Sequence, residues 1–277
     1  MDTDLRQQAL TWQIGVWDSM AERYVREIDR RFAPVVAQVV ARAAPQVGAS
    51  ILDLGTGTGA VAARLAPVVG PAGQILAVDI SPAMLAIARQ RLAAQGLAQV
   101  GLCAGQAEAI PAADGSFDLV VASLSLMYAI DRAAAAREIG RVLKAGGRFV
   151  AAAWAGPQEC DIVLFQQTAG RFAGPPPVPG IGPGALADPA PLLAQLATAG
   201  IAAHVEQETL GFDFDDFTSA WEVLAGVTTA HLAPEDQAAA KAAVFQTMYP
   251  QGDGPRHFRN VTHFIVGSRA GEGIDQG

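Results

Sequence analysis

A glycine-rich loop at residues 55–59 constrains the fold of this chain more than any other feature. An apolar run at 51–54 precedes the loop and a helical pattern at 60–69 follows it, so the loop joins a strand to a helix. Glycine adopts positive φ and lets a ligand approach the backbone closely. In open α/β sheets, a loop of this kind lies at the carboxyl ends of the strands, where ligands bind.

Short apolar runs alternate with amphipathic segments around this loop. We expect strands at 51–54, 74–78, 100–103, 117–122 and 148–154, with helices between them. Ser81 and Pro82 supply an N-cap and a first-turn proline for one of these helices. The alternation predicts an α/β fold with a parallel sheet, helices on both faces and right-handed crossovers.

The two ends of the chain depart from this alternation. Apolar side chains at helical spacing over 14–44 predict an N-terminal helical cap, which we assign to residues 1–46, ahead of a core at 47–156. Helices expected at 157–173, 189–199 and 215–248 interrupt two further strands at 202–210 and 258–266. We therefore expect residues 157–269 to add the last strands with helical lid insertions, and residues 270–277 to form a disordered tail.

The charge of the chain narrows the class of partner. The formal charge of the chain is −8, whereas nucleic-acid binding requires a surface rich in basic residues. The acidic N-terminus lacks the apolar region of a secretory signal, and no apolar stretch reaches the ~18 residues of a membrane-spanning helix. Cys103 and Cys160 lie in apolar contexts without metal-ligand spacing, as expected for reduced thiols. These features predict a cytoplasmic protein.

Two carboxylates flank the glycine loop. Asp79 ends the next strand, about 20 residues further on, where a carboxylate accepts hydrogen bonds from ribose hydroxyls. Enzymes that bind NAD share this arrangement, and Gly55, Gly57 and Ala60 also satisfy the dinucleotide pattern. Asp53, directly before the loop, would repel a pyrophosphate but suits a ligand with an ammonium and a sulfonium group. The residues favour S-adenosylmethionine, with a nicotinamide-dependent oxidoreductase as the remote alternative.

Three stretches carry a resemblance to a known family. They are ILDLGTGTG at 51–59, LAVDISPAMLAIAR at 76–89 and GQAEAIPAADGSFDLVVASLSLMYAIDRAAAAREIGRVLKAGGRF at 105–149. In order and spacing they resemble the class I methyltransferases, specifically the branch of the ubiquinone/menaquinone C-methyltransferases. The resemblance extends over residues 16 to 154, and it implies a Rossmann-like sheet with S-adenosylmethionine as cofactor.

The resemblance also implies a cofactor-binding set drawn from the N-terminal helix and from the ends of the expected strands. Its members are Tyr24, Asp53, Gly55, Thr56, Gly57, Asp79, Ile80, Met84, Gln106, Ala107, Glu108 and Ser123.

The members of this set have different expected roles. Asp53 and the glycine loop would contact the methionine part of the cofactor, and Asp79 would hold the ribose. Gln106 stands where the family usually has Asp, and its amide oxygen can still accept from the adenine amino group. Ser123 would lie near the methyl group. Tyr24, together with Trp17, would cover the cofactor from the N-terminal helix or simply pack there.

Methyl transfer from a sulfonium needs at most one proton acceptor, and none when the nucleophile is an enol or a phenol. Near-attack positioning alone can lower the barrier by about 7–11 kcal/mol. His257 is the favoured general base among four histidines, and Tyr128 is the candidate for a substrate-facing residue. The scattered histidines and cysteines predict no metal site.

The aromatic side chains of the expected lid would suit a polyketide, quinone or terpenoid-like molecule, or they form the core of the lid itself. We expect methylation of oxygen or carbon on a small, largely apolar molecule. The alternative is a methyltransferase-like protein that keeps the cofactor but catalyses a non-methyl reaction such as cyclisation. The sequence leaves the oligomeric state open, a homodimer being one possibility.

Overall fold

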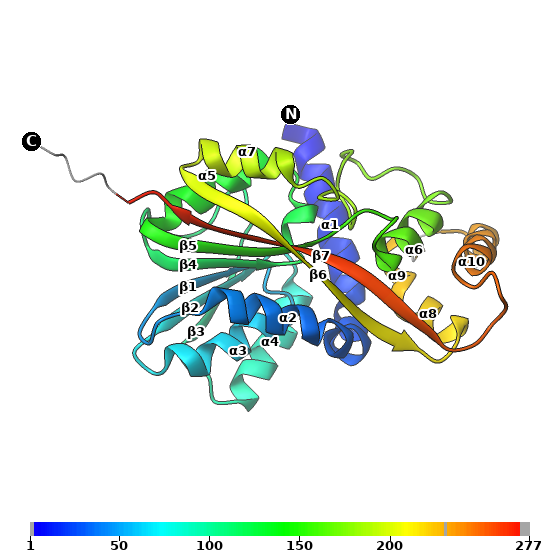
Figure 1. Ribbon diagram of the computed structural model, residues 1–277, viewed down its shortest axis with the longest axis horizontal. Helices are drawn as coiled ribbons and strands as arrows, with labels where there is room; N and C mark the ends of the chain where they lie inside the picture. Colours follow the sequence, from blue (N-terminus) through cyan, green and yellow to red (C-terminus); the bar gives the residue numbers. More distant parts are fainter. Residues whose placement is uncertain (1–2, 230–231, 272–277) are drawn as a thin grey trace, which may run out of the picture.

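The computed structural model describes residues 3–229 and 232–271, which include one sheet of seven strands in the order β3-β2-β1-β4-β5-β7-β6 (Figure 1). Five strands are parallel: β1 (Ser50–Leu54), β2 (Gln74–Asp79), β3 (Val100–Ala104), β4 (Phe117–Ser123) and β5 (Leu143–Trp154). The central β1 is fully buried at Ile51 and Leu52, as near-continuous apolar runs in parallel sheets are. The expected Rossmann-like sheet is confirmed.

The last two strands run antiparallel to their neighbours in the sheet. β6 (Ile201–Phe214) and β7 (Arg256–Arg269) pair with each other antiparallel, and β7 also pairs antiparallel with β5. The helices that connect β6 to β7 lie beyond the strand ends instead of crossing a face of the sheet (Figure 1). The chain therefore returns in the opposite direction, as in a long hairpin.

Helices cover both faces of the sheet. α2 (Asp29–Ala43), α3 (Ala60–Val69) and α4 (Pro82–Ala94) lie on one face, and α5 (Arg132–Val142) and α7 (Ala190–Thr198) lie on the other (Figure 1). α4 begins at the expected cap, because the Ser81 hydroxyl oxygen accepts a hydrogen bond from the Met84 N–H at 3.1 Å. The main hydrophobic core lies between these helices and the sheet.

The N-terminal segment is one long helical run with an irregular turn in the middle. α1 (Thr3–Arg23) passes into a π-helical turn, η1 (Tyr24–Ile28), and then into α2. The helix starts earlier than the pattern over 14–44 predicts. π-Helical turns are rare and are found mostly at functional sites. Tyr24 is the first residue of this turn.

A second core cluster surrounds the far ends of β6 and β7. The helices α6 (Asp161–Gly170), α8 (Phe217–Leu224), α9 (Gly226–Thr229) and α10 (Pro234–Met248) enclose it. Most of the lid aromatics singled out in the sequence pack here, including Phe165, Phe214, Phe217 and Tyr249. They form the interior of this region. Of the expected tail at 270–277, residues 272–277 lie outside the described residues.

Within the described ranges, no helix has both the length and the apolarity to cross a membrane. The same residues contain no group of three or more His, Cys, Asp or Glu side chains that could hold a metal ion.

Candidate functional site

A cavity of about 120 Å³ opens at the carboxyl ends of β1, β2 and β4. We call it the cofactor cavity. Most of the predicted set lines it: Tyr24, Gly55, Gly57, Asp79, Ile80, Met84, Gln106, Ala107, Glu108 and Ser123. Asp53 and Thr56 do not. The parallel strands bring these residues together because their loops emerge at the same edge of the sheet.

Asp79 holds two loops at the end of β2. Its Oδ2 accepts a hydrogen bond from the Gly57 N–H at 2.7 Å, and its Oδ1 accepts one from the Ser81 N–H at 2.9 Å. Burial raises the pKa of this carboxyl group, against the effect of the backbone hydrogen bonds. One carboxylate thereby links the glycine loop to the start of α4 and also faces the cavity.

Asp53 does not line the cofactor cavity, where we expected it to contact the ligand. Its carboxyl group is 1% exposed, and Oδ2 accepts hydrogen bonds from the Thr56 hydroxyl at 2.7 Å and the Ala62 N–H at 3.1 Å. Burial raises its pKa to about 6. Asp53 therefore braces the glycine loop against the start of α3, and the expected direct contact with a ligand in the cavity is replaced by this indirect role.

Two glycines of the loop after β1 line the cavity, and they meet different surroundings. Gly55 has a φ of 72°, and a Cβ there would lie 2.3 Å from the Ser125 Cβ. The Ser125 hydroxyl also donates to the Leu54 carbonyl at 2.8 Å, so the loops after β1 and β4 are in close contact. Around Gly57, no atom lies within 4 Å of the corresponding position. Gly55 thus allows the loops to pack, whereas Gly57 leaves backbone open toward the cavity.

The segment Gln106–Glu108 forms another wall of the cofactor cavity. The Glu108 Oε1 accepts hydrogen bonds from the backbone N–H groups of Ile130 at 2.6 Å and Asp131 at 3.0 Å. The Glu108 carboxylate thereby joins the loop after β3 to the loop before α5.

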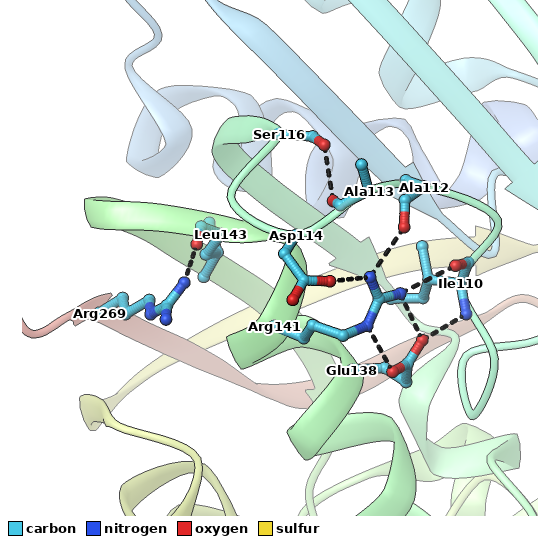
Figure 2. A network of polar contacts seen from close by, with 9 residues as sticks. All are labelled: Ile110, Ala112, Ala113, Asp114, Ser116, Glu138, Arg141, Leu143 and Arg269. Atoms are coloured by element: carbon cyan, nitrogen blue, oxygen red, sulfur yellow. Dashed lines mark hydrogen bonds and ion pairs between the residues drawn. The ribbon is translucent and has the colours of Figure 1, made fainter.

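Arg141 on α5 holds the continuation of the same loop (Figure 2). Its guanidinium donates to the carbonyls of Ile110 at 3.0 Å and Ala112 at 2.8 Å, and to Asp114 Oδ1 at 2.7 Å. Glu138 accepts from Arg141 and, at 2.8 Å, from the Ile110 N–H; the Arg141 hydrogen bond lowers the pKa of the Glu138 carboxyl. The wall beside Gln106 is therefore held in place by α5.

α1 and η1 close the cavity from the N-terminal side. Leu10, Gln13, Trp17 and Tyr24 line it, and the 5% exposed Gln13 donates from Nε2 to the Tyr128 carbonyl at 2.7 Å. The sequence analysis missed Leu10 and Gln13, together with Leu124, Ser125, Leu126, Ala129 and Ile130 from the loop after β4. The signal for Gln13 was an amide among apolar residues on one helical stripe.

A smaller cavity of about 50 Å³ adjoins the cofactor cavity. We call it the aromatic chamber, because rings from distant parts of the chain line it: Trp17, Tyr24, Phe32, Tyr128 and Trp154. Aliphatic side chains, Pro183 and the amide of Gln166 complete its walls. A wider, more open cavity of about 500 Å³ follows beneath the loop at 173–185, and Tyr128 lines all three cavities.

The two catalytic candidates separate in the structure. Tyr128 stands where the three cavities meet, and burial raises its pKa, which keeps the phenol protonated. His257 lies at the surface with a side chain 60% exposed, its Nδ1 2.8 Å from the Asp213 Oδ1, and it lines none of these cavities. The β6–β7 hairpin extends past the sheet and carries this histidine away.

Of the other two histidines that the structure describes, neither lines any of the three cavities. His204 is exposed beside Glu206, and His263 is buried within the sheet, where its Nε2 contacts the Gln207 amide at 2.9 Å. His231 lies outside the described residues.

The comparisons with known proteins agree with this geometry. A family model described as a methyltransferase domain matches residues 45–168. The chain is 32% identical over 146 residues to the ubiquinone/menaquinone biosynthesis C-methyltransferase UbiE of Hahella chejuensis, covering 49% of this chain and 56% of that protein. UbiE of Pasteurella multocida is 38% identical over 104 residues, covering 37% of this chain and 39% of that protein. The chain spans about half the length of the curated relatives it matches.

Solved structures share the fold at low identity. The YcgJ protein of Bacillus subtilis has a TM-score of 0.64 at 19% identity, covering 86% of this chain and 98% of that one. The [4+2]-cyclase SpnF has a TM-score of 0.56 at 24% identity, covering 88% and 81%. The part of the chain that holds the glycine loop and the strands around it is therefore similar to methyltransferase domains, and over about half of its length the chain resembles UbiE.

Proposed function

We propose that this protein transfers a methyl group from S-adenosylmethionine to oxygen or carbon of a small, largely apolar molecule. The observation that carries the proposal is the pair of joined cavities: one at the strand ends, where polar side chains such as Asp79 and Gln106 converge, and an aromatic one beside it. The two cavities share Trp17, Tyr24, Leu124 and Tyr128. A cofactor held in the first would present its reactive group to an acceptor held in the second.

The donor and acceptor groups of the cofactor cavity suit S-adenosylmethionine. Asp79 offers a carboxylate for the two ribose hydroxyls, and Ile80 and Met84 offer apolar surface for the adenine. Gly57 leaves room for close approach of the methionine part, and Gln106 and Ala107 stand beside the position proposed for the purine. When bound, the cofactor supplies an electrophilic methyl group on a sulfonium.

The same loop is poorly suited to a diphosphate. Phosphate binding at such loops depends on free backbone N–H groups at a helix N-terminus. Here Asp79 accepts the Gly57 N–H, and Asp53 accepts the Ala62 N–H in the first turn of α3. Carboxylates of the protein thus occupy two donors that a pyrophosphate would need, which argues against a nicotinamide cofactor.

The chamber favours an acceptor that is neutral and apolar over most of its surface. Among the described residues that line it, none is charged, and most are aromatic or aliphatic. Binding there excludes water and holds the nucleophile against the methyl group, and such positioning can lower the barrier by about 7–11 kcal/mol.

The proposal is tested by binding and turnover together. Isothermal titration should detect S-adenosylmethionine and S-adenosylhomocysteine but not NADH. Incubation with small phenols, quinols and enolisable carbonyl compounds should then release one S-adenosylhomocysteine per methylated product. Absence of S-adenosylmethionine binding at millimolar concentration would remove the proposal.

A second function remains in view, since among the described residues neither a histidine nor a carboxylate lines the chamber. A protein that keeps the cofactor but catalyses a cyclisation would need no base there. Product formation without consumption of S-adenosylmethionine identifies that case.

A further inference from the structure

Three aromatic side chains, Trp17, Tyr24 and Tyr128, line both the cofactor cavity and the aromatic chamber. The Trp17 ring centroid lies 4.8 Å from that of Tyr128 and 6.5 Å from that of Tyr24, edge-on to both. Phe32 also packs edge-on against Tyr24, with ring centroids 6.2 Å apart. Ring contacts therefore fix both phenol rings at the boundary between the two cavities.

Both phenol groups lack a partner. Within residues 3–229 and 232–271, no group accepts or donates a hydrogen bond at the hydroxyl of Tyr24 or Tyr128. The amide of Gln166, the other polar group of the chamber wall, is satisfied: its Nε2 donates to the Leu224 carbonyl at 2.6 Å, and its Oε1 accepts from the Thr228 hydroxyl. Polar groups withdrawn from bulk water are normally hydrogen-bonded, so the two hydroxyls are open to a ligand.

The surroundings keep these hydroxyls protonated. Burial raises the pKa of both tyrosines, and the nearby carboxylates of Asp29 and Asp79 raise that of Tyr24 further, while Arg91 lowers it. The Tyr128 phenol is a further cause of the raised pKa of Tyr24. Two O–H donors that line the same two cavities and do not ionise are suited to hold an oxygen with negative charge.

We propose that the Tyr24 and Tyr128 hydroxyls together bind an oxygen atom of the acceptor, and that the acceptor is a phenol or an enolisable carbonyl compound. This inference rests on the proposed function and assigns the substrate class of the same site. The acceptor loses its proton to water, its electron pair stays on the phenolate or enolate, and the two O–H groups stabilise the charge on oxygen. Stabilising the ionised acceptor in this way removes the need for a general base, which the described lining of the chamber lacks.

The test uses 4-nitrophenol, whose phenolate is yellow and which titrates near neutrality. The full-length protein is saturated with sinefungin, a cationic analogue of the cofactor that cannot transfer a methyl group, and the absorbance of bound nitrophenolate is followed against pH. The wild-type protein should ionise the bound probe at lower pH than water does. Tyr24→Phe and Tyr128→Phe should each reduce the ionisation constant of the bound probe about tenfold or more.

Tyr249→Phe is the matched control. Tyr249 lies in the second core cluster, where its hydroxyl contacts the Asp216 carbonyl at 3.3 Å, and it lines none of the three cavities. This variant should bind and ionise the probe as the wild type does. Thermal melting of all three variants checks folding, which the loss of an unpartnered hydroxyl at position 24 or 128 should leave intact.

The outcomes separate this inference from the proposed function. Failure of sinefungin to bind removes the proposed function, and the inference with it. Sinefungin binding with no binding of 4-nitrophenol, or with unchanged ionisation of the bound probe in both cavity variants, overturns the donor pair and leaves methyl transfer standing.

Discussion

Around the cofactor cavity, the carboxylates of Asp53, Asp79 and Glu108 bind backbone N–H groups of neighbouring loops, whereas around the aromatic chamber the contacts are between rings. Hydrogen bonds to charged groups demand one geometry, and each unmet partner is costly. Apolar contacts of similar volume substitute for one another at small cost. The comparison indicates that the cofactor side is rigidly specified and that the acceptor side is the adaptable half of the site.

We expect the largest effect on ligand binding from a substitution at Asp79. Asp79→Asn should weaken binding of S-adenosylhomocysteine about 100-fold. The reason is that the two charge-assisted hydrogen bonds proposed between the Asp79 carboxylate and the ribose hydroxyls, each contributing about 1.5–3 kcal/mol, become neutral or are lost. Isothermal titration measures it. Asp213→Asn, whose parent side chain is 79% exposed beside His257, is the control and should bind normally. Equal affinity of the Asp79 variant and the wild type would contradict the inference that the cofactor cavity is rigidly specified.

Gly55 provides the next test, with Gly57 as its counterpart. Gly55→Ala should lower the free energy of unfolding by about 1–3 kcal/mol, because the added Cβ meets Ser125. Gly57→Ala should cost less stability without ligand, since no atom lies within 4 Å, but should weaken cofactor binding. Denaturant unfolding and titration measure the two effects. A larger loss of stability in Gly57→Ala would show that the loops do not pack as described.

Asp53 gives a pH dependence of smaller size. Its pKa is about 6 in the folded protein, against an ordinary 3.8, so the folded state binds the proton more tightly. The stability that this proton contributes is present below about pH 4 and is lost as pH rises through about 6. The stability of Asp53→Asn relative to wild type should therefore increase across this window. Denaturant midpoints at pH 4, 5, 6 and 7 check it; a constant difference would contradict the assignment.

The smallest effect is expected on the acceptor side. Phe32 lines the aromatic chamber but not the cofactor cavity. Phe32→Leu should weaken 4-nitrophenol binding only a few-fold and leave the affinity for sinefungin unchanged, because a large apolar side chain is retained. His257→Ala, at the surface, should change neither. Loss of sinefungin binding in Phe32→Leu would show that the two halves are not independent.

The elements that the sequence predicted correctly are those with local signals. Alternating apolar runs marked β1 to β5, and Ser81 with Pro82 marked the start of α4. The antiparallel direction of β7 has no such signal, because it depends on where the connecting helices pack. Whether Asp53 faces a ligand or its own loop is likewise decided by packing around Thr56 and Ala62.

No sequence pattern could predict the aromatic chamber, for the same reason. Its rings come from residues as far apart as Trp17 and Trp154, whereas the aromatic residues concentrated near the C-terminal end form their own core. Of the two interpretations of these aromatic residues, the structure agrees with the one in which they form the core of the lid. His257 was misplaced because a residue just before a strand can lie at either end of a long hairpin.

The π-helical turn at Tyr24–Ile28 sets which stripe of α1 faces the ligands. Such a turn carries one residue more than an α-helical turn. Removing one residue between positions 24 and 28 would rotate α1 about 100° relative to α2, because an α-helix has 3.6 residues per turn. Leu10, Gln13 and Trp17 would leave the cavity as a group. A single-residue change in chain length here would thus exchange a whole wall of the binding site while every other cavity residue kept its place.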